Sequence, residues 1–151
     1  MGDHAFLQNW AIDAEVSVWK SEGAQVDMNR IRRDAAVAQR KVQEAQEAAA
    51  KKAGWILHQT IQAKHPYLKT KGFDEYTNVW SSEEGNTMVV PMRIGHRLVG
   101  CQLIKEDGSK KFLYGQRTSN AEFIFDNKGP DILCEGYATA LSIRAALKAM
   151  K

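Results

Sequence analysis

The segment TMVVPMRIGHRLVGCQLI, residues 87–104, gives the strongest indication of how this chain folds. Its two halves, Thr87–Ile94 and Arg97–Ile104, are rich in the β-branched and apolar residues that favour strands. Gly95 and His96 separate the halves, and a two-residue connection that contains glycine is typical of a tight hairpin turn. The segment therefore predicts an antiparallel β-hairpin.

Weaker signals within and after the hairpin predict further strands and a helix. Gly100, inside the second strand, predicts a bulge or a close approach of another part of the backbone. The remaining expected elements are a turn at Glu106–Ser109, strands at Lys111–Tyr114, Glu122–Phe125 and Asp131–Cys134, and a helix at Ala138–Met150. Together these elements predict an α+β fold.

The amino-terminal part of the chain has a different character. Residues 4–20 alternate apolar and polar side chains around Ile12-Asp13, which predicts a short hairpin that ends near Trp19. A long helix is expected next, over residues 27–64, because this stretch is rich in Ala, Gln, Glu, Lys and Arg. Asp27 is its expected N-cap, Val26 and Ile31 are its expected hydrophobic staple, and Trp55–Ile61 is the part expected to pack; His65-Pro66 is expected to end it.

This organisation predicts four segments. They are a hairpin segment at 1–26, a basic linker helix at 27–64, a β-rich subdomain at 65–130 and a strand–helix unit at 131–151. Residues 27–64 contain eight Lys and Arg against four Asp and Glu. Either this helix is a solvated spacer, or Arg32, Arg33 and their neighbours lie against a nucleic-acid backbone.

Composition narrows the class of protein. The chain has 151 residues, of which 44% are hydrophobic and 26% charged, and its formal net charge is +3. These values exclude collagen, a disulfide-stapled miniprotein and a wholly disordered chain. No apolar run approaches the roughly 20 residues of a membrane span, and Met1–Trp10 does not resemble a secretory signal, so we expect a cytoplasmic protein. Cys101 and Cys134 are expected to be reduced thiols within the core.

Glu135 is the candidate for chemistry. It follows the expected strand Asp131–Cys134 and precedes Gly136 and the last helix. Ligands of open α/β sheets gather at the carboxyl ends of strands, and a carboxylate there can bind a divalent metal. Gly136 permits a tight turn, and Thr139 is a candidate helix cap or phosphate contact. The alternative is that Glu135 ends the strand and faces solvent.

At this point the sequence resembles a known family. Glu135–Ala140, EGYATA, resembles the first motif of the Toprim domain in phage- and plasmid-type DNA primases. Other pieces resemble those primases in the same order: His65-Pro66-Tyr67-Leu68 followed by Lys71-Gly72 (HPYL…KG), the hairpin pieces Val89–Met92, Leu98–Gly100 and Gln102–Ile104, and Asp107–Leu113 (DG-x-K-x-F). The likeness covers about residues 65–150, and the ordered series is more specific than the EG pair alone.

The resemblance implies a function. It implies that the strand–helix unit is the start of an α/β Toprim fold and that Glu135 is a catalytic residue and a Mg²⁺ ligand. Gly136 and Thr139 are the candidate cofactor-binding residues beside it. The implied activity is the synthesis of RNA primers on single-stranded DNA during phage or plasmid replication. Template DNA and nucleoside triphosphates are the implied partners, a replicative helicase is a further candidate, and no membrane partner is expected. Lys110, Lys111 and Arg117 are candidate phosphate contacts, with Arg32 and Arg33 on the basic helix.

The chain also departs from the family pattern. Toprim proteins pair the motif glutamate with a later Asp-x-Asp, and no such pair follows Glu135. We therefore expect a fragment of a larger primase, inactive alone. Two alternatives stay open: a nucleic-acid-binding module without catalysis, and a nuclease or topoisomerase-like member of the Toprim family.

Overall fold

The computed structural model describes five stretches of the chain, which are residues 4–7, 17–20, 27–74, 79–125 and 131–150. The expected features at Ile12-Asp13 and Val26 lie outside the described residues. The chain divides into two compact units, Met1–Lys41 and Val42–Lys151. The fold is of the α+β class: a long helix precedes a five-stranded antiparallel sheet.

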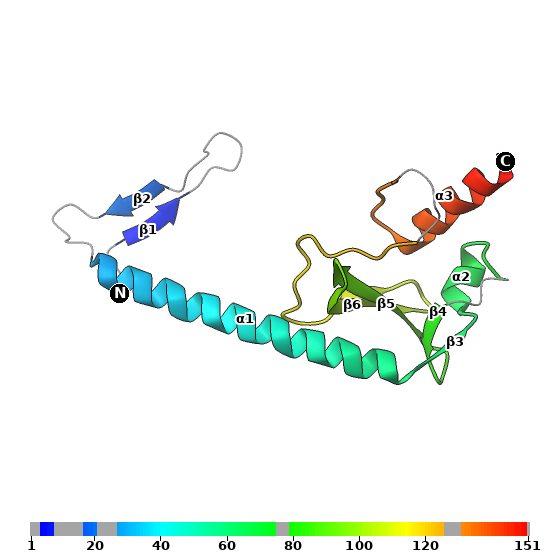
Figure 1. Ribbon diagram of the computed structural model, residues 1–151, viewed down its shortest axis with the longest axis horizontal. Helices are drawn as coiled ribbons and strands as arrows, with labels where there is room; N and C mark the ends of the chain where they lie inside the picture. Colours follow the sequence, from blue (N-terminus) through cyan, green and yellow to red (C-terminus); the bar gives the residue numbers. More distant parts are fainter. Residues whose placement is uncertain (1–3, 8–16, 21–26, 75–78, 126–130, 151) are drawn as a thin grey trace. The chain divides into compact units, whose positions relative to one another are not determined.

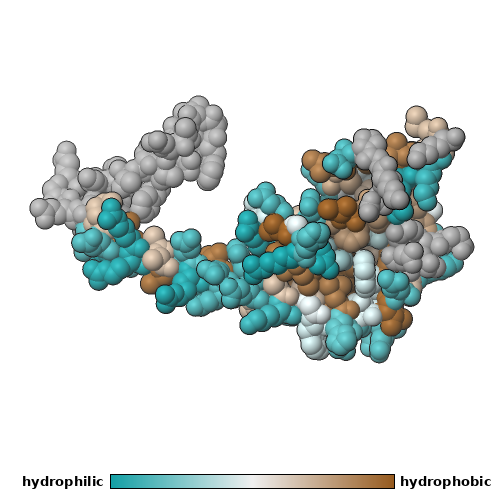
Figure 2. All heavy atoms as spheres, viewed as in Figure 1, coloured by the Kyte–Doolittle hydropathy of each residue, from teal (hydrophilic) through white to brown (hydrophobic). Residues whose placement is uncertain are grey.

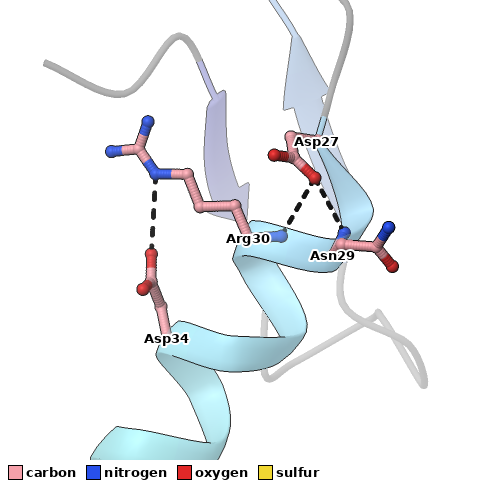
Figure 3. A network of polar contacts seen from close by, with 4 residues as sticks. All are labelled: Asp27, Asn29, Arg30 and Asp34. Atoms are coloured by element: carbon pink, nitrogen blue, oxygen red, sulfur yellow. Dashed lines mark hydrogen bonds and ion pairs between the residues drawn. The ribbon is translucent and has the colours of Figure 1, made fainter.

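The first unit contains the predicted hairpin and the start of the long helix. Strands β1 (His4–Leu7) and β2 (Ser17–Lys20) pair in antiparallel fashion, which confirms these two strands. Helix α1 (Met28–His58) begins directly after its predicted N-cap. The carboxylate Oδ1 of Asp27 accepts hydrogen bonds from the backbone N–H groups of Asn29 and Arg30, both at 3.0 Å (Figure 3). The side chain of Asp27 thus satisfies two amides that have no partner inside the helix.

Helix α1 is shorter than predicted. It ends at His58, whereas the expected helix extended to residue 64, and Thr60–Ala63 forms strand β3 instead. The Thr60 hydroxyl donates to the Leu57 carbonyl at 2.7 Å, where the helix ends. Ile61 pairs opposite Ser81 in the sheet, so a tertiary contact takes these residues away from the helix.

The second unit is built on a sheet with the strand order β3-β4-β5-β6-β7 (Figure 1). All neighbouring strands are antiparallel. After β3, the strands are β4 (Val79–Ser82), β5 (Thr87–Ile94), β6 (Arg97–Lys105) and β7 (Lys110–Phe112). The predicted hairpin is confirmed as β5–β6, with Gly95 at φ +56° in its two-residue turn. Strand β4 was not predicted from the sequence.

The β5–β6 hairpin is buried on both faces. On one face, which we call the α3-side core, Met88 and Val90 pack with helix α3 (Tyr137–Ala149). On the other, the α1-side core, Val89 packs against the carboxyl-terminal half of α1. Figure 1 shows the carboxyl-terminal part of α1 and helix α3 on opposite sides of the sheet. The buried members of the α3-side core are Tyr67, Leu68, Val79, Met88, Val90, Ile104, Tyr137 and Leu141; those of the α1-side core are Ala49, Ala53, Val89, Cys101 and Leu113.

A buried glutamine takes the place of a strand partner beside β6. The Oε1 atom of Gln116 accepts hydrogen bonds from the N–H groups of Cys101 and Leu113, both at 3.1 Å. This close approach requires Gly100, because a Cβ there would lie 2.4 Å from Gln116 Oε1. The predicted bulge is confirmed, since the register of β5 and β6 shifts between Met92 and Arg93, opposite this glycine. The group that approaches Gly100 closely is a side chain and not, as predicted, another part of the backbone.

Helix α2 (Pro66–Thr70) is short and is capped at both ends. The Nδ1 atom of His65 accepts a hydrogen bond from Tyr67 N–H at 3.3 Å, and Pro66 occupies the first helical position. Gly72, at φ +84°, ends the helix: its N–H donates to Lys69 O and the next N–H, of Phe73, donates to Leu68 O at 2.8 Å. This is the Schellman pattern. The prediction that His65-Pro66 ends the long helix is therefore wrong: α1 already ends at His58, and Pro66 begins α2.

Two predicted strands are wrong. Residues 122–125 make one isolated bridge, Glu122 to Arg93, after which Phe123 and Phe125 pack on Tyr137 with ring centroids 5.4 and 5.0 Å apart. Residues 131–134 form no strand, and Leu133 is 93% exposed. No described strand pairs with residues 131–134, so the backbone groups of this segment are left to hydrogen-bond with water.

The two cysteines differ, which corrects the expectation that both are core residues. Cys101 is buried in the α1-side core, whereas Cys134 is exposed. Burial raises the pKa of the Cys101 thiol to about 11. The predicted final helix is confirmed as α3, which starts one residue earlier than expected. Among the described residues, no helix is both long enough and apolar enough to cross a membrane.

We expect Gly100→Ala to lower the free energy of unfolding by about 2–4 kcal/mol. The new methyl group would displace Gln116 and leave two buried N–H groups unpaired. Urea denaturation monitored by circular dichroism measures the change. Gly54→Ala is the matched control, because a Cβ at this helical position would meet nothing closer than Leu98 Cδ2 at 3.9 Å, and it should leave stability unchanged or raise it by up to about 1 kcal/mol. Equal stability of the two variants would contradict the role of Gly100.

The cap of α2 should make stability depend on pH. Burial lowers the pKa of His65 below 6.5, while the Asn86 backbone and the Glu106 carboxylate raise it by smaller amounts. The neutral ring is also required for Nδ1 to accept from Tyr67. The pKa of His65 is lower in the folded state than in the unfolded state. The contribution of the neutral ring to the free energy of unfolding is therefore fully present above pH 6.5, and it is lost as the pH falls from 6.5 through the folded-state pKa.

Urea denaturation at pH 7.5 and at pH 5 tests this expectation. The wild-type chain should lose stability between the two values, and His65→Asn, which keeps a capping oxygen but does not titrate, should lose less. The same loss in both proteins would show that His65 does not cause it.

Candidate functional site

Glu135 lies at the amino-terminal end of α3, as the sequence predicted, but not at the end of a strand. It is exposed, and it follows the irregular residues 131–134. Gly136 is the N-cap of α3 in extended geometry, at φ −133° and ψ 142°, and its carbonyl accepts from Ala140 N–H at 2.9 Å. No side chain caps this helix, so the predicted capping role of Thr139 is wrong: Thr139 is the third residue of α3. Its hydroxyl oxygen would lie 3.3 Å from a Cβ at position 136.

Glu135 is not part of a cluster of metal-ligating side chains among the described residues. Nowhere in the described part of the chain do three His, Cys, Asp or Glu side chains come together as metal ligands. A hard divalent cation generally requires several oxygen ligands. Glu135 can therefore contribute one carboxylate to such a site, and further oxygen ligands would have to join it.

The predicted basic contacts do not lie together. In β7, Lys110 pairs opposite Ile104 and Lys111 opposite Leu103. Neighbouring residues of a strand point to opposite faces, so Lys110 lies on the face of the α3-side core and Lys111 on the face of the α1-side core. Arg117 is exposed, and its Nε donates to the Ser119 carbonyl at 3.4 Å. The side chain of Lys110 lines a pocket, and those of Lys111 and Arg117 are not part of its lining.

This pocket joins two of the sequence motifs that resemble the primases. The HPYL…KG segment contributes Tyr67, Thr70 and Lys71, and the DG-x-K-x-F segment contributes Lys110. The cavity has a volume of about 250 Å³, and its complete lining is Tyr67, Thr70, Lys71, Glu106, Asp107, Gly108 and Lys110. The ammonium groups of Lys71 and Lys110 lie 5.8 and 6.0 Å from the centroid of the Tyr67 ring. These distances are in the range of cation–π contacts.

Local backbone geometry explains why the pocket has this shape. Gly72 ends α2 directly after Lys71, which places this lysine at the C-cap of the helix. On the other side, Gly108 at φ +83° forms the turn between β6 and β7. Asp107 stabilises the turn by accepting from Ser109 N–H at 2.8 Å. Hydrogen bonds from Ser109 also lower the pKa of Asp107, so its carboxylate is charged at neutral pH.

Of the residues that line this pocket, only Lys110 was predicted from the sequence as a site residue. Tyr67 and Lys71 belong to the HPYL…KG motif, but only the likeness drew attention to them, and no charge pattern marked them. Tyr67 is 3% exposed, so it packs in the core and cannot act as a stacking platform for a base. The predicted phosphate contact Lys110 is joined by Lys71, not by Lys111 or Arg117.

The other basic candidates, Arg32 and Arg33, belong to the first unit. Both are exposed on α1, and Figure 2 shows hydrophilic side chains over much of the visible surface of this helix. Arg30 is paired with Asp34, with Nε to Oδ2 at 3.8 Å (Figure 3). No described acidic group forms an ion pair with Arg32 or Arg33. Their charges are therefore available to an anionic partner.

Comparison of the chain with protein families, with curated proteins and with solved structures finds no match.

Proposed function

We propose that this chain takes part in the synthesis of RNA primers on single-stranded DNA, as a Toprim-containing primase of the phage or plasmid type. The observation that supports the proposal is the convergence of the family-like motifs on one core. Tyr67 and Leu68 from HPYL, Ile104 from the hairpin, and Tyr137 and Leu141 from the EGYATA helix share the α3-side core. Residues far apart in the sequence thus form one structural unit, as expected of a single functional domain.

Within this proposal, Glu135 is the residue closest to the chemistry. Its carboxylate is exposed beside the amino terminus of α3, where the helix dipole favours an anionic group. The chemistry would be Mg²⁺-dependent nucleotidyl transfer from nucleoside triphosphates. The resemblance implies that an Asp-x-Asp pair acts with this glutamate, and these 151 residues contain none after Glu135.

Primer synthesis tests the role of Glu135. In the protein that the complete gene encodes, Glu135→Gln should reduce Mg²⁺-dependent incorporation of labelled ribonucleotides on a single-stranded template by about 100-fold or more. Glu122→Gln is the matched control, because Glu122 is also exposed and joins the sheet only through its backbone. Full synthesis by the Glu135 variant would contradict the proposed role, and absence of synthesis by the unaltered protein would contradict the proposed function.

A second candidate function is single-stranded DNA binding without catalysis, favoured by the unpaired charges of Arg32 and Arg33 on α1.

Salt dependence tests this second function. The 151-residue chain should bind labelled oligothymidylate, and replacing Arg32 and Arg33 by Ala together should reduce the slope of log K against log salt by about 1.4, or about 0.7 for each lost phosphate contact. Arg30→Ala is the control, since Asp34 already neutralises this arginine, and it should change the slope less. Fluorescence anisotropy from 50 to 300 mM salt measures the slopes. Absence of binding at 50 mM salt would eliminate this function.

A further inference from the structure

The pocket between α2 and the β6–β7 turn is lined by two lysines, Lys71 and Lys110. The ammonium groups of Lys71 and Lys110 both approach the ring of Tyr67, from two different elements of the fold. Two like charges near one ring repel each other, which is unfavourable unless an anion lies between or near them. Among the described residues, no carboxylate forms an ion pair with either lysine. The fold therefore places two ammonium groups on one cavity, and neither forms an ion pair with a described carboxylate.

Two acidic residues also line the cavity, and each has another neighbour. The Asp107 carboxylate accepts from Ser109 N–H and stabilises the turn. Glu106 interacts electrostatically with His65, the buried cap of α2. Neither compensates the lysines at ion-pair distance. Thr70, the remaining polar side chain of the lining, donates its hydroxyl to the Pro66 carbonyl at 3.2 Å, and its oxygen keeps a lone pair.

We infer that this pocket is a phosphate-binding site in which Lys71 and Lys110 bind the oxygens of one phosphate or polyphosphate group. Tyr67 is the buried aromatic floor against which both ammonium groups lie, so the lysines lose less side-chain freedom when a ligand binds. A cavity of about 250 Å³ is large enough for a phosphate group but small for a drug-sized ligand. Lysine is a common phosphate-binding residue because its ammonium is a compact point charge.

The phosphate has two possible sources, a nucleotide and a nucleic-acid backbone. The proposed function bears only on which of these two sources supplies the phosphate; the existence of the site does not depend on it. Binding can be measured without magnesium and without catalysis, so failure of primer synthesis would leave the pocket untouched. Conversely, a pocket that binds no phosphate would leave the role of Glu135 untouched.

Binding of inorganic tripolyphosphate and of labelled oligothymidylate to the 151-residue chain tests the site. Calorimetry and fluorescence anisotropy at 50 mM salt measure the two affinities. Lys71→Ala and Lys110→Ala should each weaken binding about five-fold or more, and for the oligonucleotide each should reduce the salt slope by about 0.7. Lys111→Ala is the matched control, because it removes the same charge from the next residue of β7, on the opposite face of the sheet. It should change either affinity by less than about two-fold.

Glu106→Gln provides a test of opposite sign. Removal of this carboxylate from the lining should strengthen the binding of tripolyphosphate, because a nearby negative charge repels it. Circular dichroism spectra and urea midpoints that match the unaltered chain would show that the variants are folded.

Each outcome supports the site or overturns it. Tighter binding of tripolyphosphate than of oligothymidylate would identify a nucleotide source, and the reverse order would identify a nucleic-acid backbone. The site is overturned if Lys111→Ala weakens binding as much as Lys71→Ala and Lys110→Ala do, since net charge alone would then explain the effect. It is also overturned if neither ligand binds, or if Glu106→Gln weakens binding.

Discussion

The β5–β6 hairpin is apolar on both faces, and the second unit depends on this constraint. A strand that is buried on both sides needs a covering layer on each. Ala49 and Ala53 allow α1 to approach one face closely, because their side chains are small. The aromatic and aliphatic side chains of α2 and α3 cover the other face. The arrangement of helices is therefore a consequence of the hairpin that they cover.

The backbone groups along the β6 edge of this hairpin form hydrogen bonds with a side chain, that of Gln116, as well as with strand β7. Strand β7 pairs with β6 over its three residues, Lys110–Phe112, and its last pair is Phe112 opposite Gln102. Beyond that pair, Gln116 supplies the acceptor that a longer β7 would have supplied. The chain can thus turn away from the sheet without leaving buried N–H groups unpaired.

The sequence predicted those elements whose signals are local. The β5–β6 hairpin, the Asp27 cap and helix α3 follow from apolar patterning, capping residues and turn glycines, and all three are confirmed. It failed where tertiary contacts decide. Residues 60–63 continue a helical pattern but pair with β4, and residues 131–134 have strand-like composition but no partner in the described part of the chain. The same distinction between local and tertiary signals holds for the pocket. Lys110 was predicted as a site residue from its motif, whereas its proximity to Lys71 depends on long-range packing.

The contrast between the two thiols makes the region around Glu135 accessible to spectroscopy. Cys101 is buried and its raised pKa keeps it protonated, so it reacts slowly with maleimides and iodoacetamides at neutral pH. Cys134 is exposed and directly precedes Glu135 in the chain. A fluorophore or spin label would attach at this position without mutagenesis of the other cysteine. The native chain thus carries its own attachment point for reporting changes beside the candidate catalytic residue.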